Sequence, residues 1–199
     1  MMSQPLQRVF PDRLRLPMRF DPALLRRDLA AVSGIGWTKH FVTQNYAGDW
    51  SVIPLRGPAG ETHPVRLIHP DPTAREFEDT PVLEHAPYLA RVLAAFECPR
   101  QCARLMRLAP GSTIKEHRDH DLAFEKGVAR LHIPVTTNAG VRFLLNRVRV
   151  DMEPGSMWYL RLSDPHSVSN AGTSDRVHLV IDLVANAWLE ALFERASAD

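Results

Sequence analysis

The feature that most constrains the fold of this chain is the run of short, closely spaced strand patterns in its second half. Segments rich in Val, Ile, Leu and aromatic residues alternate there with turn signals, and no helical pattern separates them. Strands are expected at residues 103–108, 128–135, 141–145, 148–152, 156–160, 166–170 and 176–183. Strands at this spacing predict an antiparallel sandwich or barrel.

The first hundred residues differ because prolines break them into short pieces. One helix is expected to begin after Asp21, a good N-cap followed by Pro22 at the first helical position. A second helix is expected at residues 87–96, and residues 50–55 are expected to form a strand between the two helices. The predicted fold class is therefore mainly β with flanking helices.

The length of 199 residues suits one domain with an ordinary core. We expect residues 1–199 to form this single domain, because no repeat or long linker divides the chain. Residues 1–100 would form a helical, proline-rich cover, residues 101–185 the strand core, and residues 186–199 a C-terminal helix.

Charge and composition exclude several classes of partner. The 24 Lys and Arg nearly balance the 23 Asp and Glu, so no basic patch for nucleic acid or an anionic membrane is expected. No apolar stretch approaches the roughly 20 residues that span a bilayer, and the N-terminus lacks a signal-peptide pattern. Cys98 and Cys102 match neither a redox nor a zinc motif. We therefore expect a cytoplasmic protein with a small-molecule or peptide substrate and leave its oligomeric state open.

Metal-capable side chains crowd into residues 117–121. His117 and Asp119 would share one face of an extended strand, whereas His120 and Asp121 are out of phase and are expected to be solvated. His166, which opens a later strand, would supply a third ligand. Two histidines and one carboxylate are typical of Fe(II) sites with one open face. Taken alone the motif is a weak signal, and a surface histidine in a charged turn is an equal alternative for His117.

Three basic residues are candidates for binding a carboxylate. Arg176 begins an otherwise apolar strand, where burial is costly unless the guanidinium meets an anion. It would hold the distal end of a dicarboxylate that chelates the iron; the alternative is a surface arginine paired with Asp175. Arg130 and His132 share one face of a strand, which faces either water or the interior.

Together these segments resemble the aspartyl/asparaginyl β-hydroxylase family of Fe(II)/2-oxoglutarate dioxygenases, which includes bacterial cis-4-proline hydroxylases. The resemblance covers about residues 40–185. It is carried by RLMRLAPGSTIKEHRD, RLHIPVTTNAGVRF, MEPGSMWYL, DPHSVSN and DRVHLVIDL, with a weaker match at WSVIPLRGPAG. It implies a double-stranded β-helix, or jelly-roll, core.

The resemblance also implies roles for individual residues. His117, Asp119 and His166 are implied to bind Fe(II), and Arg176 is implied to pair with the C5 carboxylate of 2-oxoglutarate. Polar contacts to cosubstrate or substrate are implied near Arg130 and His132. We expect His132 to contact 2-oxoglutarate, and Arg130 and Arg56 to contact the substrate.

The implied reaction is hydroxylation of an unactivated C–H bond, with O2 and 2-oxoglutarate as cosubstrates and succinate and CO2 as coproducts. The expected substrate is a free amino acid or a related small molecule. The alternatives are hydroxylation of Asp or Asn residues in a peptide or protein, and a non-catalytic metal-binding jelly-roll module. Bacterial proline hydroxylases carry an additional C-terminal region, whereas this chain stops after its expected C-terminal helix. This difference argues against proline as the substrate.

Overall fold

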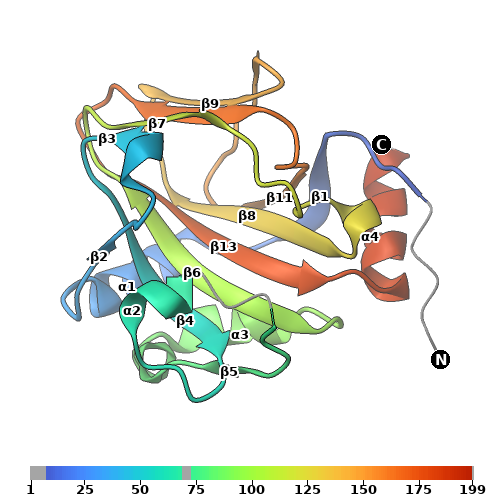
Figure 1. The fold of residues 1–199 in the computed structure, drawn as a ribbon, viewed down its shortest axis with the longest axis horizontal. Coiled ribbons are helices and arrows are strands. Elements are labelled where there is room, and N and C mark those ends of the chain that lie inside the picture. The colour runs from blue at the N-terminus through green and yellow to red at the C-terminus, as the bar shows by residue number, and fades with distance from the viewer. Residues whose placement is uncertain (1–7, 69–72, 199) are drawn as a thin grey trace.

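Two antiparallel β-sheets lie face to face in the computed structural model, which describes residues 8–68 and 73–198 (Figure 1). The larger sheet runs in the order β1 (Arg13–Arg19), β11 (Ser156–Leu160), β8 (Val128–Thr136), β13 (Arg176–Val184), β6 (Arg100–Leu108), β4 (Trp50–Pro58) and β2 (Thr38–Lys39), with β5 (Phe77–Asp79) paired to β4. The smaller sheet runs in the order β10 (Val148–Arg149), β9 (Val141–Leu145), β12 (His166–Asn170), β7 (Thr113–His117) and β3 (Tyr46–Ala47).

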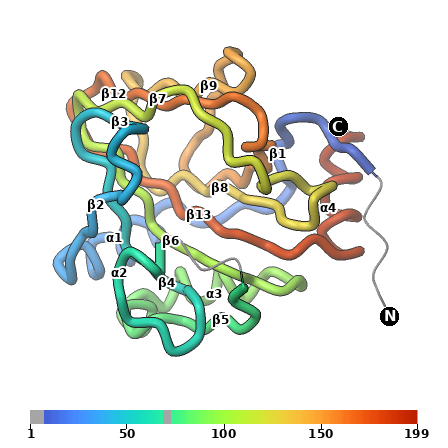
Figure 2. The backbone as a smooth tube through the Cα atoms, in the orientation of Figure 1, coloured from blue at the N-terminus to red at the C-terminus, as the bar shows by residue number. Residues whose placement is uncertain are grey.

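From β6 onward the chain alternates between the two sheets. Strands β6, β8, β11 and β13 belong to the larger sheet, and β7, the pair β9 and β10, and β12, which come between them in sequence, belong to the smaller sheet. Figure 2 shows these repeated crossings along the backbone. Such alternation is the winding of a double-stranded β-helix, so the predicted mainly β fold with a jelly-roll core is confirmed.

Helices cover the outer face of the larger sheet. The cluster of apolar side chains there includes Leu25 of α1 (Pro22–Ser33), Leu89 of α3 (Pro87–Ala94) and Phe193 of α4 (Ala187–Ser197). The Asp21 side chain caps α1 as predicted, because it accepts from two backbone N–H groups of the first turn. Shorter elements are α2 (Pro64–Ile68) and the 3₁₀ turns Thr43–Asn45, Pro81–His85 and Phe124–Lys126. No helix in the two described ranges is long and apolar enough to cross a membrane.

The larger sheet takes strands from both sides of residue 100. β4 confirms the strand expected at residues 50–55, and it pairs directly with β6. β1 was not anticipated, although Leu14 and Leu16 are buried in alternation with outward arginines. The strand core expected at residues 101–185 is therefore extended by β1, β2 and β4. Strand β4 pairs with the free edge of β6, β2 pairs with β4, and β1 pairs with the free edge of β11. This pairing satisfies backbone N–H and C=O groups that would otherwise be exposed at those edges.

Successive side chains of β13 point to opposite faces of the larger sheet, and the two faces border different apolar clusters. Val177, Leu179, Ile181 and Leu183 belong to the apolar cluster beneath the helices. The opposite side chains point into the space between the sheets, where Val180 joins a second apolar cluster that includes Phe143 and Leu145 of β9. Arg176, His178 and Asp182 share the phase of Val180 and are all buried. The polar residues of this strand therefore lie on the inner face of the larger sheet.

Candidate metal centre

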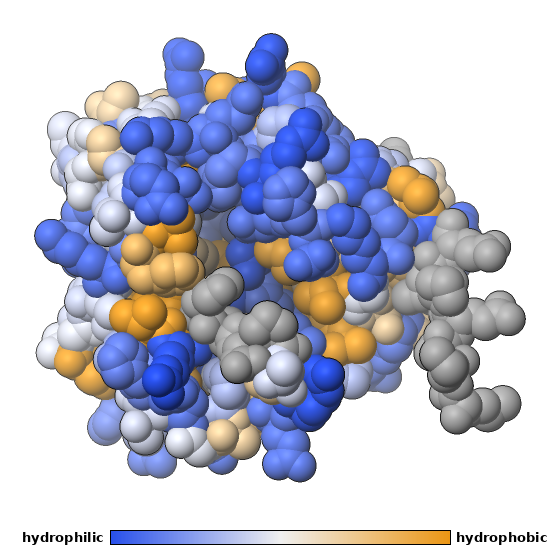
Figure 3. All heavy atoms as spheres, in the orientation of Figure 1, coloured by the Kyte–Doolittle hydropathy of each residue, from blue (hydrophilic) through white to orange (hydrophobic). Residues whose placement is uncertain are grey.

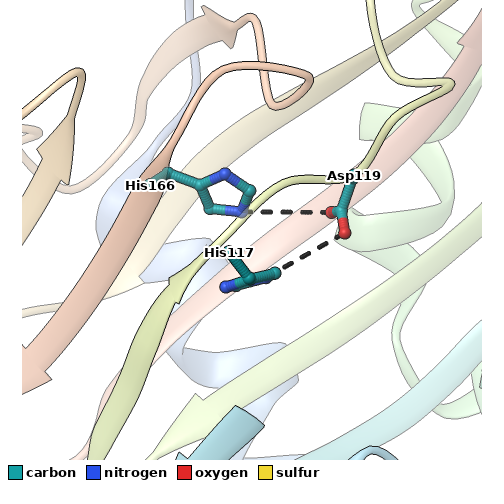
Figure 4. A group of neighbouring side chains, drawn as sticks. All are labelled: His117, Asp119 and His166. Carbon is teal, nitrogen blue, oxygen red and sulfur yellow. Dashed lines mark ion pairs between the residues drawn. The ribbon is translucent and has the colours of Figure 1, made fainter.

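His117, Asp119 and His166 come together at one end of the smaller sheet. His117 is the last residue of β7, His166 is the first residue of β12, and the two residues are directly paired across the antiparallel strands. One donor atom from each of the three side chains lies within 4.8 Å of the others. Figure 4 shows both imidazoles facing the carboxylate, with Nε2 of His117 3.9 Å and Nε2 of His166 4.0 Å from an oxygen of Asp119.

The position of Asp119 corrects one step of the sequence reasoning. β7 ends at His117, so strand alternation does not bring Asp119 to the same face. The turn after the strand does so instead: the backbone N–H of Asp119 donates to the carbonyl of Leu162 at 2.8 Å. His120 and Asp121 are exposed, as predicted.

Both imidazoles are oriented for binding a metal through Nε2. Nδ1 of His117 donates to the Lys115 carbonyl at 2.8 Å, and Nδ1 of His166 donates to the Asp164 carbonyl at 3.0 Å. These bonds place the proton on Nδ1 and leave the Nε2 lone pair facing Asp119, a common arrangement around metal-binding histidines. Burial lowers the pKa of His166 to about 4, so its ring is neutral near pH 7. Two imidazoles and one carboxylate fit a ferrous ion, and none of these three donor groups is a thiolate, the group that structural zinc sites often use.

Arg176 lies buried on the opposite sheet, and no carboxylate within residues 8–68 and 73–198 pairs with it. Its side chain is 3% exposed, Nη2 donates to Nδ1 of His178 at 2.8 Å, and Nε has no partner among the described residues. Burial lowers the pKa of this guanidinium to about 9. The alternative of a surface arginine paired with Asp175 is therefore wrong. Arg176 borders a cavity of about 350 Å³ between the sheets, together with Phe143 and His178.

His132 faces the interior rather than water. It is 5% exposed, its ring contacts Phe143 edge-on, and Nε2 has no partner in the described parts of the chain. Its Nδ1 lies 3.4 Å from Nδ1 of His178. Burial, and after it the charge of Arg176, hold the pKa of His132 well below its usual value, so the ring is neutral.

Arg130 is held by two carboxylates. Its Nε and Nη2 donate to Asp182 at 2.6 and 2.9 Å, and its Nη1 donates to Asp119 at 3.3 Å. Arg104 forms a further ion pair with Asp182 and donates to the Ile68 carbonyl. Burial opposes ionisation of Asp182, but Arg104 and Arg130 outweigh it and hold the pKa of this carboxyl below its usual range. Arg130 therefore links the carboxylate of Asp119 to that of Asp182.

Arg56 lies outside this cluster. Its nitrogens donate to the carboxylate of Asp79, the carbonyl of Phe77 and the carbonyl of Arg100 at 2.6, 2.6 and 3.2 Å. These bonds tie β4 to β5 and β6 at the far edge of the larger sheet. The structure thus brings together six of the seven predicted site residues and leaves Arg56 with a role at the sheet edge.

Three buried polar residues of the site region were not predicted from the sequence, namely Arg104, His178 and Asp182. The partly buried His40 was not predicted either. The signal for His178 and Asp182 was their even spacing from Arg176 within an apolar strand. His40 stacks on Trp50, with ring centroids 3.6 Å apart, and had no sequence signal.

Figure 3 shows a hollow near the centre of the face that Figure 1 presents, with hydrophobic side chains on either side of it.

Comparisons with known proteins show what this chain is similar to. A family model described as aspartyl/asparaginyl beta-hydroxylase matches residues 23–186. An L-proline cis-4-hydroxylase from Rhizobium meliloti (strain 1021) is 27% identical over 177 residues, which cover 87% of this chain and 61% of that protein. This chain therefore spans about three fifths of the length of that relative.

Two solved structures show the same fold at low sequence identity. An oxidoreductase of the 2OG-Fe(II) oxygenase family from Burkholderia pseudomallei superposes with a TM-score of 0.57 at 16% identity, covering 88% of each chain. A viral collagen prolyl hydroxylase from Paramecium Bursaria Chlorella virus-1 gives a TM-score of 0.51 at 9% identity, covering 88% of this chain and 97% of the other. Both similarities concern the fold.

Proposed function

Since this chain belongs to the aspartyl/asparaginyl β-hydroxylase family, whose model matches well over half of its length, we propose that it is an Fe(II)- and 2-oxoglutarate-dependent hydroxylase. The resemblance seen in the sequence is confirmed by that match. The proposed substrate is a free amino acid or a related small molecule, and the activity of the L-proline cis-4-hydroxylase relative supports this class.

The observation that carries the proposal is the pairing of two incomplete sites across the gap between the sheets. On the smaller sheet, His117, Asp119 and His166 present three donor atoms within 4.8 Å of one another. On the larger sheet, Arg176 presents a buried guanidinium whose Nε has no partner among the described residues. A metal ion alone completes only the first site. A dicarboxylate that chelates the metal at one end and meets Arg176 at the other completes both.

The residues of the chain have separable tasks in this scheme. His117, Asp119 and His166 would hold the ferrous ion, and Arg130 would keep the Asp119 carboxylate in place. When bound, the iron would supply O2 activation, in which 2-oxoglutarate and O2 yield succinate and CO2 and the remaining oxygen atom enters a substrate C–H bond. Arg176 and His132 would orient the cosubstrate, and the apolar side chains of Phe143 and Val180 would exclude water.

A hydroxylase of Asp or Asn residues in a peptide is the second candidate, because the matching family is described by those two residues. A non-catalytic metal-binding module is disfavoured, since such a module has no need of a buried guanidinium on the opposite sheet that meets no carboxylate among the described residues. We also propose a cytoplasmic location, which the two free cysteines, Cys98 and Cys102, support.

The test is incubation with Fe(II), ascorbate and 2-oxoglutarate together with a panel of substrates. The panel contains free amino acids, L-proline among them, beside peptides that contain Asp or Asn. Succinate is measured together with the gain of one oxygen atom by mass spectrometry, and the Asp119→Ala variant serves as the control for metal-dependent turnover. We expect one free amino acid to give both signals. Oxidation of peptides alone would favour the second candidate, and no succinate above that of the variant would contradict the enzyme assignment.

A further inference from the structure

His178 is buried next to the two side chains proposed to bind the cosubstrate. It lies two residues after Arg176 on the inner face of β13 and accepts from Nη2 of Arg176 at 2.8 Å. A guanidinium has only N–H donors, so Nδ1 of His178 must be the acceptor in this bond. Burial holds the pKa of His178 well below its usual value, so the ring is neutral and carries its single proton on Nε2.

The protonation of His178 determines that of His132. The two Nδ1 atoms lie 3.4 Å apart, and two lone pairs would repel each other across this contact. Because Nδ1 of His178 is already an acceptor, His132 has its proton on Nδ1. Its buried Nε2 is then a bare lone pair, which agrees with the lack of any partner for this atom in the described chain. In this state His132 can accept a hydrogen bond in the site but cannot donate one.

A carboxylate needs the opposite arrangement, because its oxygens only accept hydrogen bonds. Nε of Arg176 is free for such a carboxylate, and a two-pronged contact through Nε and Nη2 would also turn Nη2 toward the ligand and away from His178. The same ligand would face a lone pair on His132. His178 borders the cavity beside Arg176, which gives its ring access to solvent for proton exchange. Phe143 packs against Arg176 and His132 and offers no polar group in place of either.

We propose that His178 is a positioning residue that couples the orientation of Arg176 to the tautomer of His132 when 2-oxoglutarate binds. Without ligand, His178 accepts from both neighbours. With ligand, Nη2 of Arg176 turns to the carboxylate, the proton on Nδ1 of His132 moves to Nδ1 of His178, and Nε2 of His178 releases its proton to water. Nε2 of His132 takes a proton from water and donates it in a hydrogen bond to the cosubstrate. Each ring stays neutral with one proton. This coupling rests on the function proposed above.

The tautomer change has a direct spectroscopic test. The protein is loaded with Zn(II), which is diamagnetic, and the ¹⁵N resonances of His132 are recorded with and without 2-oxoglutarate. We expect the proton on Nδ1 in the free protein and on Nε2 in the complex. The ¹⁵N resonances of His178 should show the opposite change, from a proton on Nε2 to a proton on Nδ1, which a purely structural role for His178 would not produce. A proton on the same nitrogen of His132 in both states would overturn the proposal.

Variants of His178 provide a second measurement. His178→Leu removes the acceptor that Arg176 uses only in the free protein. Binding of 2-oxoglutarate should therefore tighten roughly 10- to 100-fold in calorimetry, as expected when a hydrogen bond to a charged group is lost from the free state alone. Zn(II) affinity should stay unchanged. His178→Asn retains an amide that can accept or donate near the position of Nδ1, and binding should stay within about threefold of the wild type. The exposed His120→Asn is the matched control.

The outcomes separate this inference from the proposed function. Wild-type binding of 2-oxoglutarate together with unchanged binding by His178→Leu would overturn the coupling alone. If wild-type protein loaded with metal does not bind 2-oxoglutarate, the proposed function and the coupling both fail. If His178→Leu does not fold, the resonances of wild-type His132 and the binding by His178→Asn still decide between the outcomes.

Discussion

Replacing Asp182 by Asn is expected to weaken both the fold and the metal centre, because one carboxylate serves two buried guanidinium groups. Asp182 accepts two hydrogen bonds from Arg130, which lies directly opposite on β8, and forms an ion pair with Arg104. The side chains of Asp182 and Arg104 are only 8% and 5% exposed. The amide keeps the size of the side chain but removes its charge and turns one acceptor into a donor that faces the arginines.

The magnitude follows from the burial. Removing one member of a buried ion pair leaves the other uncompensated and typically costs about 3–5 kcal/mol. For a chain of this length, about 3 kcal/mol lowers Tm by roughly 6 to 12 °C. Arg130 would also lose the anchor from which it donates to Asp119, and loss of such an outer partner typically weakens metal affinity about 10- to 100-fold.

Urea unfolding and calorimetric titration with Fe(II) or Co(II) measure the two effects. The matched control is Asp79→Asn, which breaks the ion pair of Arg56 with a carboxylate that is 53% exposed. An exposed pair is worth about 0–1 kcal/mol, and this control should leave metal affinity unchanged. If Asp182→Asn unfolds within about 1 kcal/mol of the wild type and binds metal normally, the assigned role of this carboxylate is refuted.

Three further predictions follow from the same geometry. Arg176→Lys keeps a charge but loses the two-pronged donor, so KM for 2-oxoglutarate should rise at least about tenfold in succinate assays; an unchanged value would contradict the role of Arg176. Asp119→Ala should abolish measurable Fe(II) binding in calorimetry while the circular dichroism spectrum stays the same, and retained binding would refute the ligand set. Burial lowers the pKa values of three histidines, His132, His166 and His178. Below about pH 6.5 the unfolded chain therefore binds more protons than the folded protein. The free energy of unfolding should decrease as the pH is lowered, by up to about 1.4 kcal/mol per pH unit for each histidine. Urea unfolding of the metal-free protein at about pH 7.5 and about pH 5.5 tests this, and equal stabilities at the two values would contradict the burial of neutral rings.

The sequence made most of the strands predictable because their apolar residues stand in short blocks between clear turns. β13 and β8 were expected nearly to the residue. The grouping of His117, Asp119 and His166 was also predictable, since His117 and Asp119 are close in sequence and His166 follows a proline turn. β1 was missed because Pro17 interrupts a segment of alternating Leu and Arg residues, a composition that is equally typical of a loop.

The partners of Arg130 could not be predicted, because they depend on strand register. Arg130 meets Asp182 only because β8 and β13 pair with these two residues opposite each other, 52 positions apart in the chain. A slip of one residue would turn Asp182 toward the apolar cluster beneath the helices. Nothing local in the sequence fixes this register, so Arg130 was assigned to the substrate, whereas its guanidinium contacts Asp182 and Asp119.

The distribution of unpaired polar atoms on the larger sheet supports the proposal that its inner face binds a ligand. Buried atoms without a partner in the described chain include three N–H donors on this sheet, at Trp50, Arg104 and Arg176. A buried donor without an acceptor typically costs about 1–3 kcal/mol, and that cost persists in the free protein. Acceptor-rich ligands recover it, and 2-oxoglutarate carries five oxygen atoms that can accept. The end of β13 at Asp182 is different, because its charges are already paired and hold Asp119. One strand therefore positions the proposed metal ligand at one end and leaves an open donor for a carboxylate at the other.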